Sequence, residues 1–161
     1  MKTIEDKLNV LAEIAARLNQ AHLTWALGAS AMLYFHHLTE DFHDLDIMIV
    51  DEDAEQAKAL LQTLGVLEPP QAGGSYQTKH FHEFIIDEVE VDLIGGFAIV
   101  ADGIVHDCSL RPEDITGSVQ VHGRTVFLQS LQAWQKYYAL MGRVQKAELI
   151  RSVLQNDPSL R

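Results

Sequence analysis

The chain has 161 residues, a formal net charge of −11 and one cysteine, Cys108. This length predicts one domain over residues 1–161. One cysteine excludes an intramolecular disulfide, and no apolar run resembles a signal peptide or reaches the roughly 20 residues that span a bilayer, so we expect a cytoplasmic protein without a membrane partner. The net negative charge argues against DNA or long RNA as a substrate and is better suited to a cationic small molecule or a protein hydroxyl.

The N-terminal segment predicts an amphipathic helix, because apolar residues recur at helical spacing from Thr3 to about Gln20. An apolar strand follows over Leu23–Leu27 and runs into Gly28. Glycine has no Cβ, so a ligand can approach the backbone there. Ser30 begins a second predicted helix, whose free N–H groups and dipole attract phosphate. The alternative is a plain glycine turn with Ser30 as a helix cap.

The next predicted strand, Asp44–Val50, begins with two carboxylates. Alternate side chains of a strand point to the same face, so Asp44 and Asp46 stand side by side. Neighbouring carboxylates repel each other unless a cation or a shared proton relieves them, and Mg²⁺ is the usual cation. The polar connector before this strand adds two further acidic residues, Glu40 and Asp41.

Residues 51–53 predict a cap for a helix over residues 54–64, and residues 66–76 predict a loop long enough to overhang a site. Two strands follow, Thr78–Ile86 and Glu88–Ile94. In the second of them, Asp92 can complete a carboxylate triad if the strand lies beside Asp44–Val50. Lys79 offers a cation that can contact phosphate, although a lysine on an exposed strand is more often simply solvated.

A His-x-His pair, His80 and His82, lies on one face of the predicted strand Thr78–Ile86. Such a pair can bind zinc, and His36, His37 and His43 are further candidates. The alternative is a set of polar side chains on an exposed strand face. No cysteine cluster or His-Glu-x-x-His motif supports the zinc hypothesis.

The C-terminal third predicts a strand or bend over Phe97–Val100, an irregular stretch over residues 104–114, and a strand–turn–strand unit over Val119–Leu128. Ser130 caps a final helical region, about residues 130–155, which Gly142 is expected to kink. The chain is therefore of the mixed α/β (α+β) class.

The ordered set Gly28-Ala29-Ser30, Asp44-x-Asp46 and Asp92 resembles the nucleotidyltransferase superfamily. The likeness is closest to small single-domain members, namely lincosamide-type antibiotic nucleotidyltransferases and nucleotidyltransferase-like toxins of abortive-infection systems. It implies a mixed β-sheet flanked by helices, with a C-terminal helical segment. It also implies that Lys136 points into a nucleotide cleft, the alternative being a surface lysine on an amphipathic helix. Arg143 and Lys146 resemble the family's Arg-x-x-Lys-like element and are weaker candidates than Lys136.

The resemblance implies that two Mg²⁺ ions are held by Asp44, Asp46 and Asp92. The reaction would move an NMP from an NTP to a hydroxyl of a small molecule or protein and release pyrophosphate. Asp92 is the candidate general base, and Gly28 and Ser30 would hold the β- and γ-phosphates. The acidic connector favours an alternative, a regulatory or antitoxin-like binding module with little catalysis. The oligomeric state is open.

Overall fold

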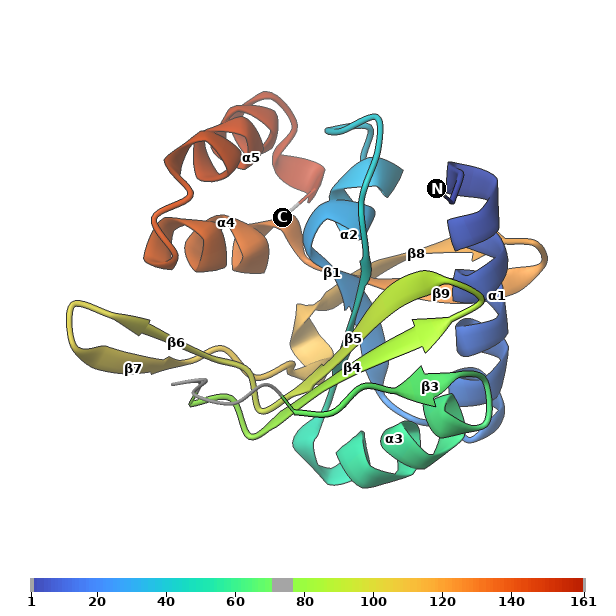
Figure 1. The fold of residues 1–161 in the computed structure, drawn as a ribbon. Helices are drawn as coiled ribbons and strands as arrows, with labels where there is room; N and C mark the ends of the chain where they lie inside the picture. Colours follow the sequence, from blue (N-terminus) through green and yellow to red (C-terminus); the bar gives the residue numbers. More distant parts are fainter. Residues whose placement is uncertain (1, 71–76, 161) are drawn as a thin grey trace.

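The computed structural model describes residues 2–70 and 77–160. Its strands form one large mixed sheet and one separate hairpin (Figure 1). The sheet strands are β1 (Trp25–Gly28), β2 (Leu45–Ile49), β3 (Val66–Leu67), β4 (His80–Ile86), β5 (Val89–Gly95), β8 (Ile115–Val121) and β9 (Arg124–Gln129). The hairpin consists of β6 (Ala98–Ala101) and β7 (Ile104–Asp107). The seven strands of the sheet are ordered β3-β4-β5-β2-β1-β9-β8.

Helices cover both faces of this sheet (Figure 1). They are α1 (Ile4–Gln20), α2 (Ala29–Phe35), α3 (Ala54–Gln62), α4 (Leu131–Leu140) and α5 (Val144–Asn156), with short 3₁₀ turns at η1 (Asp51–Asp53), η2 (Pro112–Asp114) and η3 (Pro158–Leu160). Thr3 caps α1, and its hydroxyl accepts a hydrogen bond from the backbone N–H of Asp6. Within the described residues, no helix is long and apolar enough to cross a membrane.

The central strands are buried because their apolar residues alternate toward the core. In β2, Leu45, Ile47 and Ile49 are fully buried, while Asp46 points to the opposite face. The β2–β5 pair is parallel and the β1–β2 and β4–β5 pairs are antiparallel, so the sheet is mixed, as expected. The predicted fold class is therefore confirmed.

Three expectations needed correction or completion. Residues 104–114 were expected to be irregular, but Ile104–Asp107 forms a strand that pairs with β6. The C-terminal helical region is divided into α4 and α5, because Gly142 adopts a φ of +77° between them. Of the loop predicted over residues 66–76, the first two residues form β3, while positions 71–76 lie outside the described residues.

Candidate active site

The sheet register brings the predicted carboxylates together. Asp46 lies directly opposite Asp92 across the β2–β5 pair, and opposite Gly28 across the β1–β2 pair. Asp44 precedes β2, and one carboxylate oxygen from each of Asp44, Asp46 and Asp92 lies within 4.8 Å of the other two. All three side chains are partly buried. Three such oxygens in this space match the ligands that a hard divalent cation prefers.

The electrostatics of this group show how strongly the three charges oppose one another. Burial, followed by repulsion from Asp44 and Asp92, raises the pKa of Asp46 well above its usual range. Burial, followed by repulsion from Asp44, raises the pKa of Asp92 to about 7. A bound cation would relieve this repulsion, so the donor set fits a divalent metal ion.

A hydroxyl and a lysine lie beside the carboxylates. The Lys146 ammonium, from α5, donates a hydrogen bond to the Ser30 hydroxyl at 3.2 Å and lies 5.2 Å from the centre of the Tyr138 ring. Burial and the neighbouring Arg143 lower the pKa of Lys146, while Asp46 opposes this shift. One cation and one hydroxyl next to a carboxylate group make a suitable environment for phosphate oxygens.

Gly28 is required for packing as well as for access. A Cβ at Gly28 would lie 2.5 Å from Cζ2 of Trp134, whose indole packs against the end of β1. The φ of Gly28 is −121°, so its backbone is extended and unstrained. Any side chain at this position would displace Trp134 and with it α4, which covers this face of the sheet.

The structure does not bring the other two predicted cationic residues into this group. Lys79 forms an ion pair with Asp51 of η1 at 3.0 Å. Lys136 instead lines a cavity of about 490 Å³ beside α4, together with Asp107, Arg111 and Asp114. The lysine that lies beside Ser30 and the triad is instead Lys146, the last residue of the Arg143-x-x-Lys146 element.

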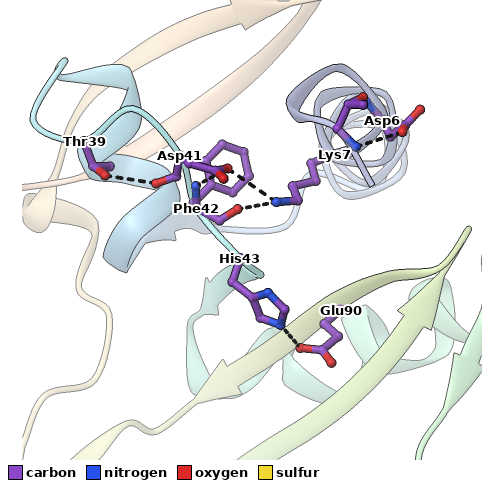
Figure 2. A network of polar contacts seen from close by, with 8 residues as sticks. Asp6, Lys7, Thr39, Asp41, Phe42, His43 and Glu90 are labelled. Carbon is purple, nitrogen blue, oxygen red and sulfur yellow. Dashed lines mark hydrogen bonds and ion pairs between the residues drawn. The ribbon is translucent and has the colours of Figure 1, made fainter. Parts of the chain in front are cut away.

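In the acidic connector before Asp44, Asp41 is held by contacts with α1. Figure 2 shows that the buried Lys7 of α1 donates to the carbonyl of Phe42 and contacts the Asp41 carboxylate at 3.5 Å. At the end of the connector, His43 meets Glu90 of β5 at 2.8 Å. These contacts fix the segment that delivers Asp44 to the site, and they give Asp41 a structural partner.

An acidic cavity of about 360 Å³ adjoins Asp92. Besides Asp92, it is lined by three further carboxylates, Glu68, Glu83 and Glu90. Glu83 faces this cavity because it lies directly opposite Asp92 in the β4–β5 register. The predicted strand over Thr78–Ile86 could have identified Glu83, once its partner in the sheet was known.

Several solved structures share this fold. A structure described as a nucleotidyltransferase from Thermotoga maritima has a TM-score of 0.73 and 25% identity, over 96% of this chain and 96% of that chain. ANT(2'')-Ia in complex with adenylyl-2''-tobramycin has a TM-score of 0.63 and 16% identity, over 94% and 91%. A nucleotidyltransferase-like protein from Paracoccidioides brasiliensis has a TM-score of 0.54 and 13% identity, over 92% and 77%.

No curated protein matches the chain. The family model of aminoglycoside-2''-adenylyltransferase matches residues 10–151, which include β1, β2, β5 and the helices that carry Ser30 and Lys146. The resemblance to small nucleotidyltransferases is thereby confirmed. On this match, together with the shared fold, the chain belongs to the aminoglycoside-2''-adenylyltransferase family of the nucleotidyltransferase superfamily.

Proposed function

We propose that the protein transfers an NMP from an NTP to a hydroxyl group of a small, positively charged acceptor and releases pyrophosphate. The observation that carries this proposal is the convergence of Asp44, Asp46 and Asp92, whose carboxylate oxygens lie within 4.8 Å of one another. Mg²⁺ ions held by these three residues would neutralise phosphate charge and lower the pKa of the acceptor hydroxyl.

The chain's own side chains would orient the two substrates. Ser30 and Lys146 would bind phosphate oxygens of the NTP, because they present a hydroxyl and a cation next to the triad. Asp92 would accept the proton of the attacking hydroxyl, since it belongs to the triad and also lines the acidic cavity. In-line attack on the α-phosphorus would then expel pyrophosphate.

The acidic cavity supports a cationic acceptor. Glu68, Glu83 and Glu90 line it beside Asp92, and the chain as a whole carries a formal charge of −11. Amine-bearing molecules are attracted by such a field, whereas polyanions are repelled. The adenylyl-2''-tobramycin bound to ANT(2'')-Ia is a nucleotidylated aminoglycoside, which makes aminoglycosides the first acceptors to test.

The test is pyrophosphate release from each of the four NTPs with Mg²⁺, using a panel of aminoglycosides and matched neutral sugars. We expect turnover with amine-bearing acceptors, and we expect Asp46→Asn to reduce it about 10³-fold or more, since metal ions contribute several kcal/mol and each 1.36 kcal/mol is tenfold. Asp102→Asn, at an exposed turn, is the control and should retain turnover. Wild-type rates in Asp46→Asn would overturn the proposed role of the triad.

A further inference from the structure

We propose that a second metal site, for one Zn²⁺ ion, lies between β4 and α3 and is formed by His80, His82 and Glu55. One ligand atom from each of these three residues lies within 4.8 Å of the other two. Two imidazoles and one carboxylate are a common ligand set for zinc, with water in the remaining position. This site goes beyond the proposed transfer reaction and shares no residue with it.

The site lies on the opposite face of the sheet from the carboxylate triad. In the β4–β5 register, Glu83 pairs with Asp92 and His82 pairs with the buried Leu93. Because side chains alternate along a strand, His80 and His82 point to the face opposite Glu83 and Asp92. That face is covered by α3, which lies against the β3–β4 edge in Figure 1 and contributes Glu55.

The first independent sign of a ligand is an unsatisfied nitrogen. Nε2 of His82 is buried and has no hydrogen-bond partner among the described residues. A buried polar atom without a partner is costly, and such atoms in native proteins are normally satisfied by protein groups, water or an ion. Zinc would use the lone pair of this nitrogen directly.

The second sign is the way in which His80 is held. Its Nε2 lies 2.8 Å from an oxygen of Asp51, while its Nδ1 lies on the side of Glu55, at 3.8 Å from the carboxylate. Histidines that bind metals characteristically donate their other ring N–H to a carboxylate, which fixes the tautomer and orients the ring. The contact with Asp51 therefore occupies Nε2 of His80 and orients the ring, so that Nδ1 is available to bind the ion. Asp51 is in turn fixed by Lys79 at 3.0 Å.

The exposure of the Glu55 side chain leaves room for the site to close around an ion. Zn–N and Zn–O distances of about 2.0–2.2 Å place tetrahedral ligand atoms roughly 3.3–3.5 Å apart, so a movement on the order of 1 Å is needed. The Glu55 side chain is 76% exposed and can supply this movement without repacking the core. A bound ion would tie the beginning of β4 to the beginning of α3 and would add to the stability of this edge.

The experiment is a zinc titration of the full chain carrying Asp44→Asn and Asp46→Asn, which removes competition from the triad. Competition with a chromophoric chelator measures affinity, metal analysis after dialysis measures stoichiometry, and thermal unfolding measures stabilisation. We expect one retained equivalent of Zn²⁺ and a higher Tm in its presence.

Variants in this background test each ligand. We expect His82→Gln to weaken Zn²⁺ binding by at least about 100-fold and Asp51→Asn to weaken it about 10- to 100-fold. Glu55→Gln gives a second test of a ligand at an exposed position, where the substitution does not disturb folding. His122→Gln is the matched control, because His122 also contacts a carboxylate, Glu5 at 3.0 Å, but belongs to no three-ligand group among the residues that the structure describes.

Two results would overturn the proposal. One is less than one equivalent of Zn²⁺ retained by the protein with the triad removed. The other is equal zinc affinity in His82→Gln, Glu55→Gln and the His122→Gln control. The titration uses protein without a functional triad. Its result would therefore stand even if the protein proved not to transfer NMP.

Discussion

At the scale of single residues, the carboxylate triad is unfavourable for the metal-free protein. Asp46 and Asp92 are partly buried next to each other and to Asp44, and burial together with mutual repulsion raises their pKa values. Groups with perturbed pKa values cluster at functional sites, because a binding site is built for the charge of its ligand. The repulsion among the three carboxylates therefore destabilises the metal-free protein, and a bound divalent cation would reduce it.

The first prediction is a pH dependence of stability in EDTA. The pKa of Asp92 is about 7 in the folded protein and 3.8 in the unfolded chain, so the folded state binds more protons between these values. The stabilisation that comes from protonated Asp92 is complete below about pH 4. It is lost as the pH rises to about 7, because the carboxyl group then ionises in the folded protein. We expect the Tm of Asp92→Asn minus that of wild type to increase over this window.

Thermal unfolding from pH 4.5 to 8 measures this difference. Asp102→Asn at an exposed turn is the control and should show a constant offset from wild type. Saturating Mg²⁺ should raise the Tm of wild type at pH 8 and leave Asp92→Asn nearly unchanged. A pH-independent offset for Asp92→Asn would contradict the proposed repulsion.

The second prediction distinguishes two lysines. Lys146 contacts Ser30 next to the triad, whereas Lys136 lines the cavity beside α4. We expect Lys146→Met to lower kcat/KM for NTP about 10- to 100-fold, since a hydrogen bond to a charged group contributes about 1.5–3 kcal/mol. Lys136→Met should remain close to wild type. The opposite order of effects would restore Lys136, which the family resemblance implies, as the nucleotide-binding lysine.

At the scale of elements, local patterns predicted most of the structure. The capping residue Thr3, the alternation in β2 and β5, and the turn at His122-Gly123 all depend on near neighbours in the sequence. The strand β7 escaped prediction because Ile104 and Val105 are both exposed, so the segment has no alternation between buried and polar residues.

The sequence ranked Lys146 below Lys136 for a different reason. Lys146 reaches Ser30 only because the chain reverses at Gly142 and folds α5 back over α2. This is a tertiary contact between residues 116 positions apart, and no local periodicity encodes it. The carboxylates, in contrast, could be predicted, because strand alternation together with one assumed strand pairing brings them together.

The third prediction concerns the connector held by Lys7. Its ammonium donates to the carbonyl of Phe42 and contacts Asp41, and the side chain is buried. Lys7→Met keeps the aliphatic stem but leaves the carbonyl unpaired, which should reduce the free energy of unfolding by about 1–3 kcal/mol. Transfer should also slow, because this connector positions Asp44.

Urea unfolding and turnover of the variant check this prediction. Lys2→Met is the control, because Lys2 forms an exposed ion pair with Glu88, and exposed pairs contribute little to stability. Equal unfolding midpoints for the Lys7 and Lys2 variants would show that the buried contact does not stabilise the connector.

At the scale of the whole molecule, the sheet separates two chemical environments. One face carries the carboxylate triad with Ser30 and Lys146, and the other carries the histidine pair under α3. The strongly acidic chain would repel a free triphosphate, so the nucleotide is expected to bind as its Mg²⁺ complex. Binding of nucleotide should therefore depend on both the metal ion and the triad.

The most direct measurement is calorimetry of NTP binding with and without Mg²⁺, on wild type and on Asp44→Asn/Asp46→Asn. We predict binding of at least one NTP by wild type that requires Mg²⁺ and is lost in the double variant, while circular dichroism shows an unchanged fold. Binding that is indifferent to Mg²⁺ or to the two substitutions would contradict the assignment of the triad. Failure of wild type to bind any of the four NTPs would contradict the transfer function itself.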